Sequence, residues 1–240
     1  MSQKEYIFSS LPKIVVSISD KESNQKIQSL PIDILEIRVD HYKDRSGEYL
    51  YSNILHRRDL GMPLILTIRN QKDEGAVCPY LSDDIKYDLF CKLIDIVDIV
   101  DVELTSPINA DVIHLAKQHN KLVILSRHNL YCTPEVSWME SILQESLHKG
   151  ADIIKIAARA NSREDVINLL EFVLKYKDKN IVVMSLGEIG AISRLMFPFA
   201  GSMFTYSYIN YSMADGQVCF SRLYEDMSFY KLRPSIRHKQ

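Results

Sequence analysis

Short apolar runs recur along the chain about every 20 to 35 residues, and longer amphipathic stretches separate them. Eight of these runs are strand-like, at residues 13–19, 34–39, 64–69, 99–104, 122–126, 153–157, 181–185 and 202–206. Six of the eight are rich in Ile and Val, as strands buried on both faces of a parallel sheet should be. The pattern therefore predicts eight buried strands.

The stretches between the runs have helical periodicity, and several begin with a capping residue. Ser106-Pro107 and Thr133-Pro134 each place a hydroxyl directly before a proline, which favours a helix start at that point. Ser162 precedes Asp165 by three residues, the spacing of a capping box. Ser82 precedes a predicted apolar helix face that consists of Ile85, Leu89, Leu93 and Ile94.

A strand followed by a helix, repeated eight times, is the arrangement of a (β/α)8 TIM barrel. The chain has 240 residues and contains no repeat or linker, so we expect a single barrel domain over residues 1–240. A doubly wound open sheet is the alternative. That fold usually begins with a glycine-rich turn, which is missing here.

Composition narrows the possible functions. The net charge is −2, which gives no electrostatic case for nucleic acid or for an acidic membrane surface. No apolar run approaches the length of a membrane span, and the first ten residues lack the apolar core of a signal peptide, so we expect a cytoplasmic protein.

Metal and phosphate motifs are missing from the sequence. The four cysteines form no CxxC pair, no histidine pair has zinc spacing, and neither GxGxxG nor a Walker-type loop occurs. We therefore expect reduced, structural cysteines and no metal site.

Polar side chains gather where the predicted strands end, which is where a barrel places its catalytic groups. The strand ends and the loops that follow them carry Glu36, Arg38, Asp40, Arg69, Glu74, Asp101, Glu103, His128, Lys155, Arg194 and Gln217. Each charge taken separately fits a solvated rim or a salt bridge between strands. Their convergence on one rim favours an active site instead.

Lys155 interrupts a buried apolar run, where an ammonium is costly unless it pairs or loses its proton. One interpretation is a lysine at the mouth of its strand that extends to water. The other is an amine whose charged form is disfavoured by burial and by nearby arginines, and which condenses with a ketone to give an imine. His128, one strand away, suits proton transfer, and the arginines suit a carboxylate or hydroxyls.

These residues resemble the type I 3-dehydroquinate dehydratases, the Schiff-base family of the shikimate pathway. The similarity runs from the first strand to the loop after the eighth. It is carried by Glu36 to Asp40, Thr67 to Arg69 with Glu74-Gly75, Asp101 to Leu104, Ser126 to His128 with Thr133-Pro134, Lys155, Ser185 to Gly187, Ser193-Arg194 and Gly216-Gln217.

The resemblance implies a (β/α)8 barrel that removes water from 3-dehydroquinate to give 3-dehydroshikimate. Lys155 would form an imine with the C3 ketone, His128 would move the protons, and Glu74 would pair with His128. The ring hydroxyls would be held by Glu36, Arg38 and Arg69, and the carboxylate by Arg194 and Gln217. The resemblance also implies a homodimer with neither a metal nor an organic cofactor.

The loop before Gln217 departs from the family pattern, which usually has a hydroxyl residue followed by Ala-Pro before Gly-Gln. Met213 takes the place of the hydroxyl, Ser212 lies one position early, and Asp215 brings a negative charge near an anionic substrate. Ala76 replaces a second glycine after Glu74. Weaker carboxylate binding or slower loop closure is the expected effect.

Two other functions compete with the dehydratase. A class I aldolase also uses a barrel lysine, but aldolases of phosphorylated sugars need a phosphate site near strands seven and eight, where this chain offers Arg194 and one GxxG. The third hypothesis is a barrel that binds a shikimate-like ligand or a partner without turning it over.

Overall fold

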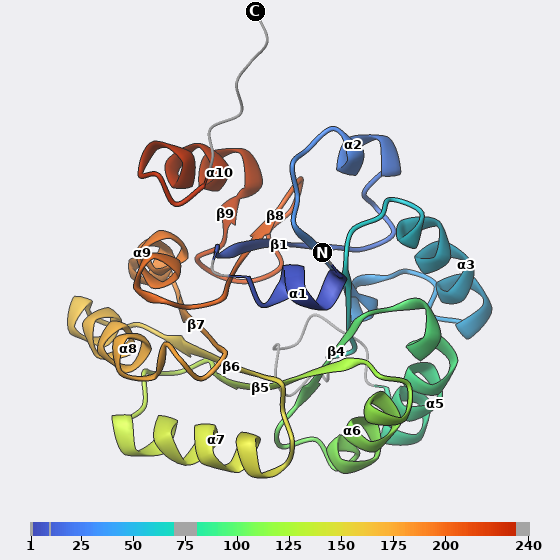
Figure 1. Ribbon diagram of the computed structural model, residues 1–240, viewed down its shortest axis with the longest axis horizontal. Coiled ribbons are helices and arrows are strands. Elements are labelled where there is room, and N and C mark those ends of the chain that lie inside the picture. The colour runs from blue at the N-terminus through green and yellow to red at the C-terminus, as the bar shows by residue number, and fades with distance from the viewer. Residues whose placement is uncertain (1, 10, 70–80, 234–240) are drawn as a thin grey trace, which may run out of the picture.

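The computed structural model describes residues 2–9, 11–69 and 81–233, and its core is a ring of parallel strands (Figure 1). All eight predicted strands are present within a few residues of the expected bounds. They are β1 (Lys13–Ile18), β2 (Ile34–Arg38), β3 (Leu64–Thr67), β4 (Ile99–Glu103), β5 (Leu122–Asn129), β6 (Ile153–Arg159), β7 (Ile181–Leu186) and β8 (Phe204–Tyr208). A short strand, β9 (Val218–Cys219), pairs with β8.

Parallel pairing runs in the order β7-β6-β5-β4-β3-β2-β1-β8-β9. Between β7 and β8 the ring is completed by the amide of Met203, which donates to the carbonyl of Ile181 at 2.9 Å. Beside it the amide of Val183 donates to Ser202 Oγ at 3.1 Å. The predicted (β/α)8 barrel is confirmed.

Helices surround the ring of strands (Figure 1). The α-helices are α1 (Gln3–Ile7), α2 (Asn24–Gln28), α3 (Gly47–Arg58), α5 (Asp83–Leu93), α6 (Asn109–Gln118), α7 (Val136–His148), α8 (Arg163–Tyr176), α9 (Ser193–Ala200) and α10 (Phe220–Phe229). Short 3-10 helices are η1 (Val39–His41), η2 (Ile94–Ile96) and η3 (Ile189–Ile192).

Two of the predicted helix starts are confirmed. Ser162 caps α8 in a capping box with Asp165, and Ser82 Oγ accepts the amide of Ile85 at the start of α5. The predicted apolar face of α5 is partly wrong, because Ile85 is exposed and Lys86 takes the buried position.

The other two predicted starts are wrong because their hydroxyls are not used as caps. Ser106-Pro107 forms a turn first, in which the amide of Asn109 donates to the Ser106 carbonyl, so α6 begins two residues after the proline. The Thr133 hydroxyl donates to the carbonyl of Arg159, and Glu135 occupies the cap position of α7.

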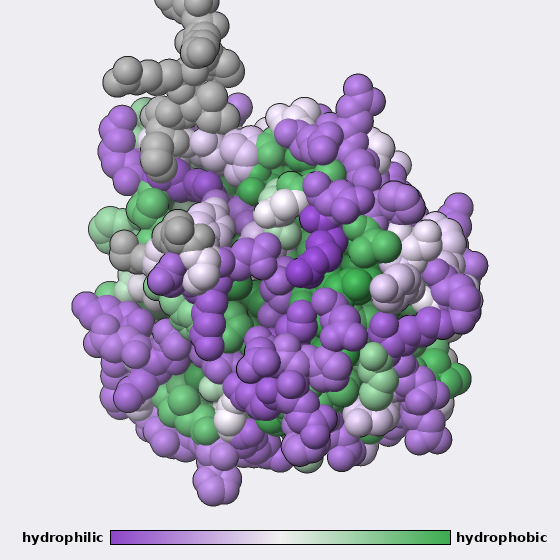
Figure 2. Space-filling view, turned by 45° about the vertical axis from the view of Figure 1, so that its right-hand side comes forward, coloured by the Kyte–Doolittle hydropathy of each residue, from purple (hydrophilic) through white to green (hydrophobic). Residues whose placement is uncertain are grey.

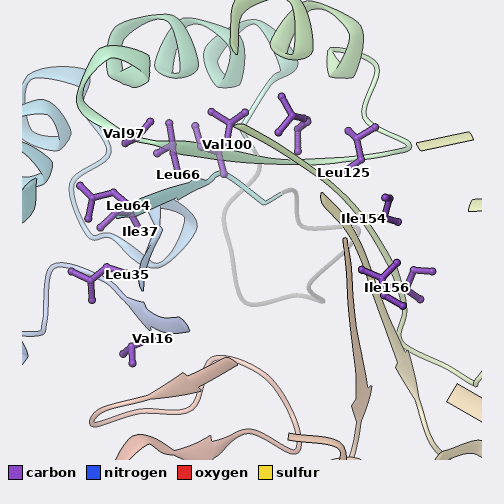
Figure 3. Packing of buried hydrophobic residues seen from close by; sticks show 14 of the residues in the cluster. Val16, Leu35, Ile37, Leu64, Leu66, Val97, Val100, Leu125, Ile154 and Ile156 are labelled. Atoms are coloured by element: carbon purple, nitrogen blue, oxygen red, sulfur yellow. The ribbon is translucent and has the colours of Figure 1, made fainter. Parts of the chain in front are cut away.

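Apolar side chains on the outer face of the strands pack against the helices (Figure 3). Alternation along β1 and β2 places Val16, Leu35 and Ile37 in this layer, whereas Val15 and Ile34 point into the ring. The strands are therefore buried on both faces, which explains their runs of Ile and Val.

The interior of the ring changes from apolar to polar along the strands. At the amino ends, Val15, Ile34, Ile65 and Phe204 form one cluster with Ile7, so α1 closes that end of the barrel (Figure 1). Further along the same strands the inward positions are occupied by Ser17, Glu36, Thr67 and Tyr206. An apolar floor thus supports a polar chamber at the carboxyl ends.

On the face shown in Figure 2, hydrophilic side chains cover most of the surface and hydrophobic ones form smaller patches between them. Across the described residues, no helix is long and apolar enough to cross a membrane. Within the same ranges, no three or more His, Cys, Asp or Glu side chains are grouped as metal ligands.

Candidate active site

A cavity of about 210 Å³ opens at the carboxyl ends of the strands. Seven of the eight predicted site residues line it, namely Glu36, Arg38, Arg69, His128, Lys155, Arg194 and Gln217. Glu74, the eighth, and Ala76 lie outside the described residues. The cavity wall also includes apolar side chains, among them Ala157, Met184 and Leu186, so the polar groups face a partly apolar space.

Lys155 lies in the middle of β6 and its side chain is buried inside the ring. Its Nζ is 2.9 Å from Asp101 Oδ2 on β4 and 3.5 Å from Glu36 Oε1 on β2. The same atom lies 4.0 Å from the ring centroid of Tyr206 on β8, a cation–π distance. Three strands besides its own therefore fix the position of the amine.

The direct neighbours of Lys155 differ from those expected. Arginines were predicted to surround the amine, but the charged groups in contact with it are carboxylates. Arg38 is paired with Asp40, and Arg69 with Asp101, so both guanidinium charges are shared with acidic groups. The amine is held in an ion-pair network rather than isolated among like charges.

Glu36 and Asp101 are both fully buried and both remain ionised. Burial would raise the pKa of Glu36, but the charges of Lys155 and Arg38 outweigh it and hold the pKa below its usual value. For Asp101 burial acts in the same direction, and Arg69 with Lys155 lowers the pKa well below the usual value. Two carboxylates thus stay charged beside the amine.

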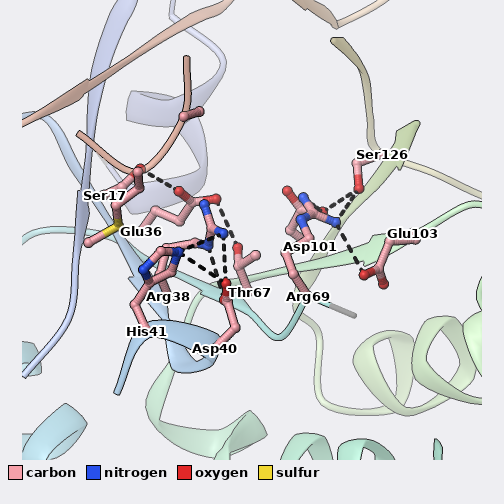
Figure 4. Close-up of polar contacts among 12 residues, drawn as sticks. Ser17, Glu36, Arg38, Asp40, His41, Thr67, Arg69, Asp101, Glu103 and Ser126 are labelled. Atoms are coloured by element: carbon pink, nitrogen blue, oxygen red, sulfur yellow. Dashed lines mark hydrogen bonds and ion pairs between the residues drawn. The ribbon is translucent and has the colours of Figure 1, made fainter. Parts of the chain in front are cut away.

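Hydrogen bonds hold both carboxylates in fixed orientations (Figure 4). Glu36 accepts from Ser17 Oγ at 2.5 Å and from Thr67 Oγ1 at 3.0 Å. Asp101 Oδ1 accepts from Ser126 Oγ at 2.7 Å and lies 2.7 Å from a terminal nitrogen of Arg69. These hydrogen bonds restrict the motion of the two carboxylates that contact Lys155.

His128 projects from β5, the strand beside Lys155. In the parallel register Ser126 faces Lys155, so His128 lies two residues closer to the cavity mouth. Burial lowers the pKa of His128 well below its usual value, and the charges of Arg69 and Lys155 lower it further. The imidazole is therefore neutral near pH 7, the form that accepts a proton. Its Nδ1 is buried and receives no hydrogen bond from the described residues.

Arg194 is buried in the site and has no acidic partner among the described residues. Its side chain, from α9, is 1% exposed, and neither terminal nitrogen meets a hydrogen-bond acceptor there. Burial lowers its pKa to about 10, so the guanidinium stays charged at neutral pH. A buried, charged fork that lines a cavity is suited to an anion.

Gln217 lies in the loop of residues 209–217 that leaves β8 and forms part of the cavity wall. Its Oε1 accepts the amides of Met213 at 2.7 Å and Ala214 at 3.2 Å. The carbonyl end of the side chain is therefore used within the loop, and the amide nitrogen carries the remaining donors. Met213 also lines the cavity, so its departure from the expected hydroxyl residue places an apolar side chain in the wall.

Three residues of the site were not among the predicted site residues. Asp101 was grouped with the polar residues at the strand ends, but no catalytic or binding role was predicted for it. Tyr206 fell within the strand-like run at residues 202–206 and was given no polar role, but it brings a buried hydroxyl to the cavity. Arg159 is four residues beyond Lys155 on β6, and this even spacing could have placed it on the same face.

Comparison with known proteins shows similarity over nearly the whole chain. The family model for type I 3-dehydroquinase matches residues 14–232. The 3-dehydroquinate dehydratase of Hydrogenobaculum sp. (strain Y04AAS1) is 33% identical over 223 residues, which cover 92% of this chain and 100% of that protein.

Solved structures give the same result for the fold. The 3-dehydroquinate dehydratase from Aquifex aeolicus VF5 aligns with a TM-score of 0.80 at 30% identity, covering 91% of this chain and 98% of its own. The type I enzyme from Clostridium difficile, crystallised with covalent modified comenic acid, aligns with a TM-score of 0.83 at 28% identity and covers 92% of this chain and 93% of its own.

The different pairing of two buried arginines predicts opposite effects on stability. Arg194→Met should leave the free energy of unfolding unchanged or raise it, because the substitution removes an uncompensated desolvation cost. Arg69→Met should lower the free energy of unfolding by about 3–5 kcal/mol, because it leaves the Asp101 charge without this partner. Urea unfolding followed by circular dichroism measures both. Equal losses in the two variants would contradict the assignment of Arg194 as a cation awaiting an anion.

Proposed function

Because this chain belongs to the type I 3-dehydroquinase family, we propose that it is a 3-dehydroquinate dehydratase of the shikimate pathway, which supplies aromatic amino acid biosynthesis. It would eliminate water from 3-dehydroquinate to give 3-dehydroshikimate. The observation that carries the proposal is the placement in one cavity of a buried amine, a neutral imidazole and a guanidinium without an acidic partner among the described residues.

Substrate binding follows from the charges of the cavity wall. The substrate carboxylate pairs with Arg194 and receives the amide donors of Gln217, which replaces solvation that the buried guanidinium lacks. Glu36, Arg38 and Arg69 hold the ring hydroxyls. Their contacts with Thr67, Asp40 and Asp101, respectively, keep these groups in place before the substrate arrives.

Imine formation is assigned to Lys155. Attack on the C3 ketone needs the unprotonated amine. The protons that the amine gives up pass to the carbonyl oxygen, whereas the carboxylates of Asp101 and Glu36 stay ionised in contact with Nζ. The nitrogen adds to the carbonyl carbon, and the carbonyl oxygen leaves as water. The resulting protonated imine draws electrons from the neighbouring C2–H bond.

Proton transfer is assigned to His128. The neutral imidazole takes the C2 proton, and the electrons of that bond move into the imine to form an enamine. The electrons then return as the C1–O bond breaks, and His128 gives its proton to the departing hydroxyl, which leaves as water. Hydrolysis of the imine frees the product and restores Lys155. Glu74 is assigned the hydrogen bond that orients the imidazole, for which Nδ1 of His128 is free among the described side chains.

The elimination leaves the oxidation state of the substrate unchanged, and the imine supplies the electron sink. The proposal therefore routes every step through protein side chains and requires neither a metal nor an organic cofactor. We place the enzyme in the cytoplasm, where the free thiols of Cys91, Cys132 and Cys219 would stay reduced.

We also propose that the enzyme is a homodimer. In support, α8, η3 and α9 expose several apolar side chains that line a common groove, namely Ile167, Ile189, Ile192 and Met196. Exposed apolar surface of this kind marks many protein–protein contacts.

Borohydride reduction in the presence of 3-dehydroquinate is expected to attach the carbon skeleton covalently to Lys155. Mass spectrometry of peptides locates the adduct, and ultraviolet absorbance of the conjugated product reports turnover. Lys155→Ala should lose both. Lys175→Ala, which removes a surface ion pair with Glu140, is the control and should keep both.

Full activity in Lys155→Ala would refute the imine mechanism. An adduct without any rise in absorbance in the unsubstituted protein would instead support a barrel that binds its ligand without turnover.

Loss of the imidazole should separate imine formation from elimination. His128→Ala should still form the borohydride adduct, but kcat should fall by about 10²–10⁴-fold because the proton carrier is missing. An unchanged kcat would assign the proton transfers to another residue.

The pH dependence of kcat/KM should reflect the lowered pKa of His128. The base must be neutral, so activity is retained above its pKa and is lost as the pH falls through it. Because burial lowers that pKa well below 6.5, the acidic limb of the profile should lie below pH 6.5. An acidic limb centred at or above pH 6.5 would contradict this assignment.

Sedimentation at micromolar concentration should give a mass about twice the chain mass of 27.7 kDa. A monomer throughout the concentration range used for activity would refute the homodimer.

A further inference from the structure

The loop of residues 209–217 is built as one unit that lies over the cavity. Met213, Ala214, Asp215 and Gln217 line the cavity, and Gln217 bonds the amides of Met213 and Ala214. Ser212 Oγ adds a hydrogen bond to the Ala214 carbonyl at 2.7 Å. β9, which follows Gln217 directly, pairs with β8 and anchors this end of the loop. The contacts of the preceding loop residues with the barrel therefore determine whether the loop stays over the cavity.

Those contacts differ greatly in strength. The amide of Gly187 donates to the Asp215 carbonyl at 3.4 Å, Arg194 Nε donates to the Gly216 carbonyl at 3.5 Å, and Lys21 lies 5.7 Å from the ring of Tyr211. All three are long. By contrast, Arg159 Nη2 donates to Asp215 Oδ2 at 2.7 Å, a charge-assisted hydrogen bond.

Arg159 is held in position for this contact by hydrogen bonds that do not involve the loop. It is the last residue of β6, and its Nε donates to the Leu130 carbonyl at 2.9 Å. Its own carbonyl accepts from the Thr133 hydroxyl at 2.9 Å. The guanidinium is thereby fixed against the segment that follows His128, and one of its two terminal nitrogens contacts the loop after β8.

The pair also balances charge at the cavity mouth. Asp215 by itself would repel an anionic substrate, which was the effect expected from the sequence. With Arg159 at 2.7 Å the two charges largely cancel, so the carboxylate can hold the loop without excluding the ligand.

We propose that Arg159 and Asp215 are positioning residues that form an ion-pair clasp between the end of β6 and the loop of residues 209–217. The clasp holds the loop closed so that Gln217 reaches the substrate carboxylate. Both side chains are partly exposed, at 37% and 52%, so the clasp is weak and salt-sensitive. A weak clasp suits a loop that must open in each turnover. The role in carboxylate binding rests on the proposed function, whereas the closure of the loop does not.

Hydrogen exchange followed by mass spectrometry tests the closure without using activity. Arg159→Met and Asp215→Asn should each speed exchange of the amides of residues 213–217 by about two- to fivefold, the range for an exposed ion pair. Raised salt should have the same effect on the unsubstituted protein and little effect on the double variant. Glu140→Gln, which breaks a surface ion pair between α7 and α8, is the control and should leave these amides unchanged.

Steady-state kinetics tests the role in substrate binding. Arg159→Met should raise KM for 3-dehydroquinate about fivefold with kcat changed less than twofold, because it opens the clasp and also leaves Asp215 as an unpaired negative charge. Asp215→Asn should raise KM about twofold, and the double variant should return to that level. Unchanged exchange in Arg159→Met, or KM changes that multiply in the double variant, would overturn the clasp. If the unsubstituted protein turns over no 3-dehydroquinate, the proposed function fails, and the exchange experiment still decides whether the clasp exists.

Discussion

The contact between Lys155 and two ionised carboxylates inside a closed ring of strands determines the construction of the whole site. An amine at this depth is tolerated because Asp101 and Glu36 lie within 3.5 Å of it. Those carboxylates are buried in turn and need their own donors, which Arg69 and Ser17 supply. One buried lysine therefore requires polar residues on several strands, and the apolar interior is confined to the opposite end.

Much of the fold could be predicted because it depends on local patterns. Apolar runs marked every strand of the ring, and six of the eight are rich in Ile and Val. The sequence pattern predicted β5 and β6 to be too short, because their backbone pairing continues through His128 and Arg159. Backbone pairing does not stop where side chains become polar, so the end of an apolar run is a poor guide to the end of a strand. Ser106 and Thr133 failed as helix caps because of their surroundings. A turn closed by the Asn109 amide and the Ser106 carbonyl delays the start of α6, and the Thr133 hydroxyl donates to a carbonyl of β6.

The candidate site was predictable in its members but not in its pairing. Alternation along the strands indicated which side chains face the chamber, and seven of the eight predicted residues line one cavity. Which charge meets which depends on the stagger between strands and on distances across the ring. The contact of Lys155 with Asp101, 54 positions away, and that of Arg159 with Asp215, 56 positions away, follow from closure of the barrel. No local pattern encodes such pairs.

The packing of Ile7 restricts how molecules enter and leave the barrel. With α1 seated across the amino ends of the strands, the floor beneath Lys155 is sealed by hydrocarbon. Substrate, product and every water molecule released or consumed during catalysis must then enter and leave at the carboxyl ends of the strands. A product molecule must leave before the next substrate molecule enters. The time for which the loop of residues 209–217 stays closed over that end would then set an upper limit on the turnover rate.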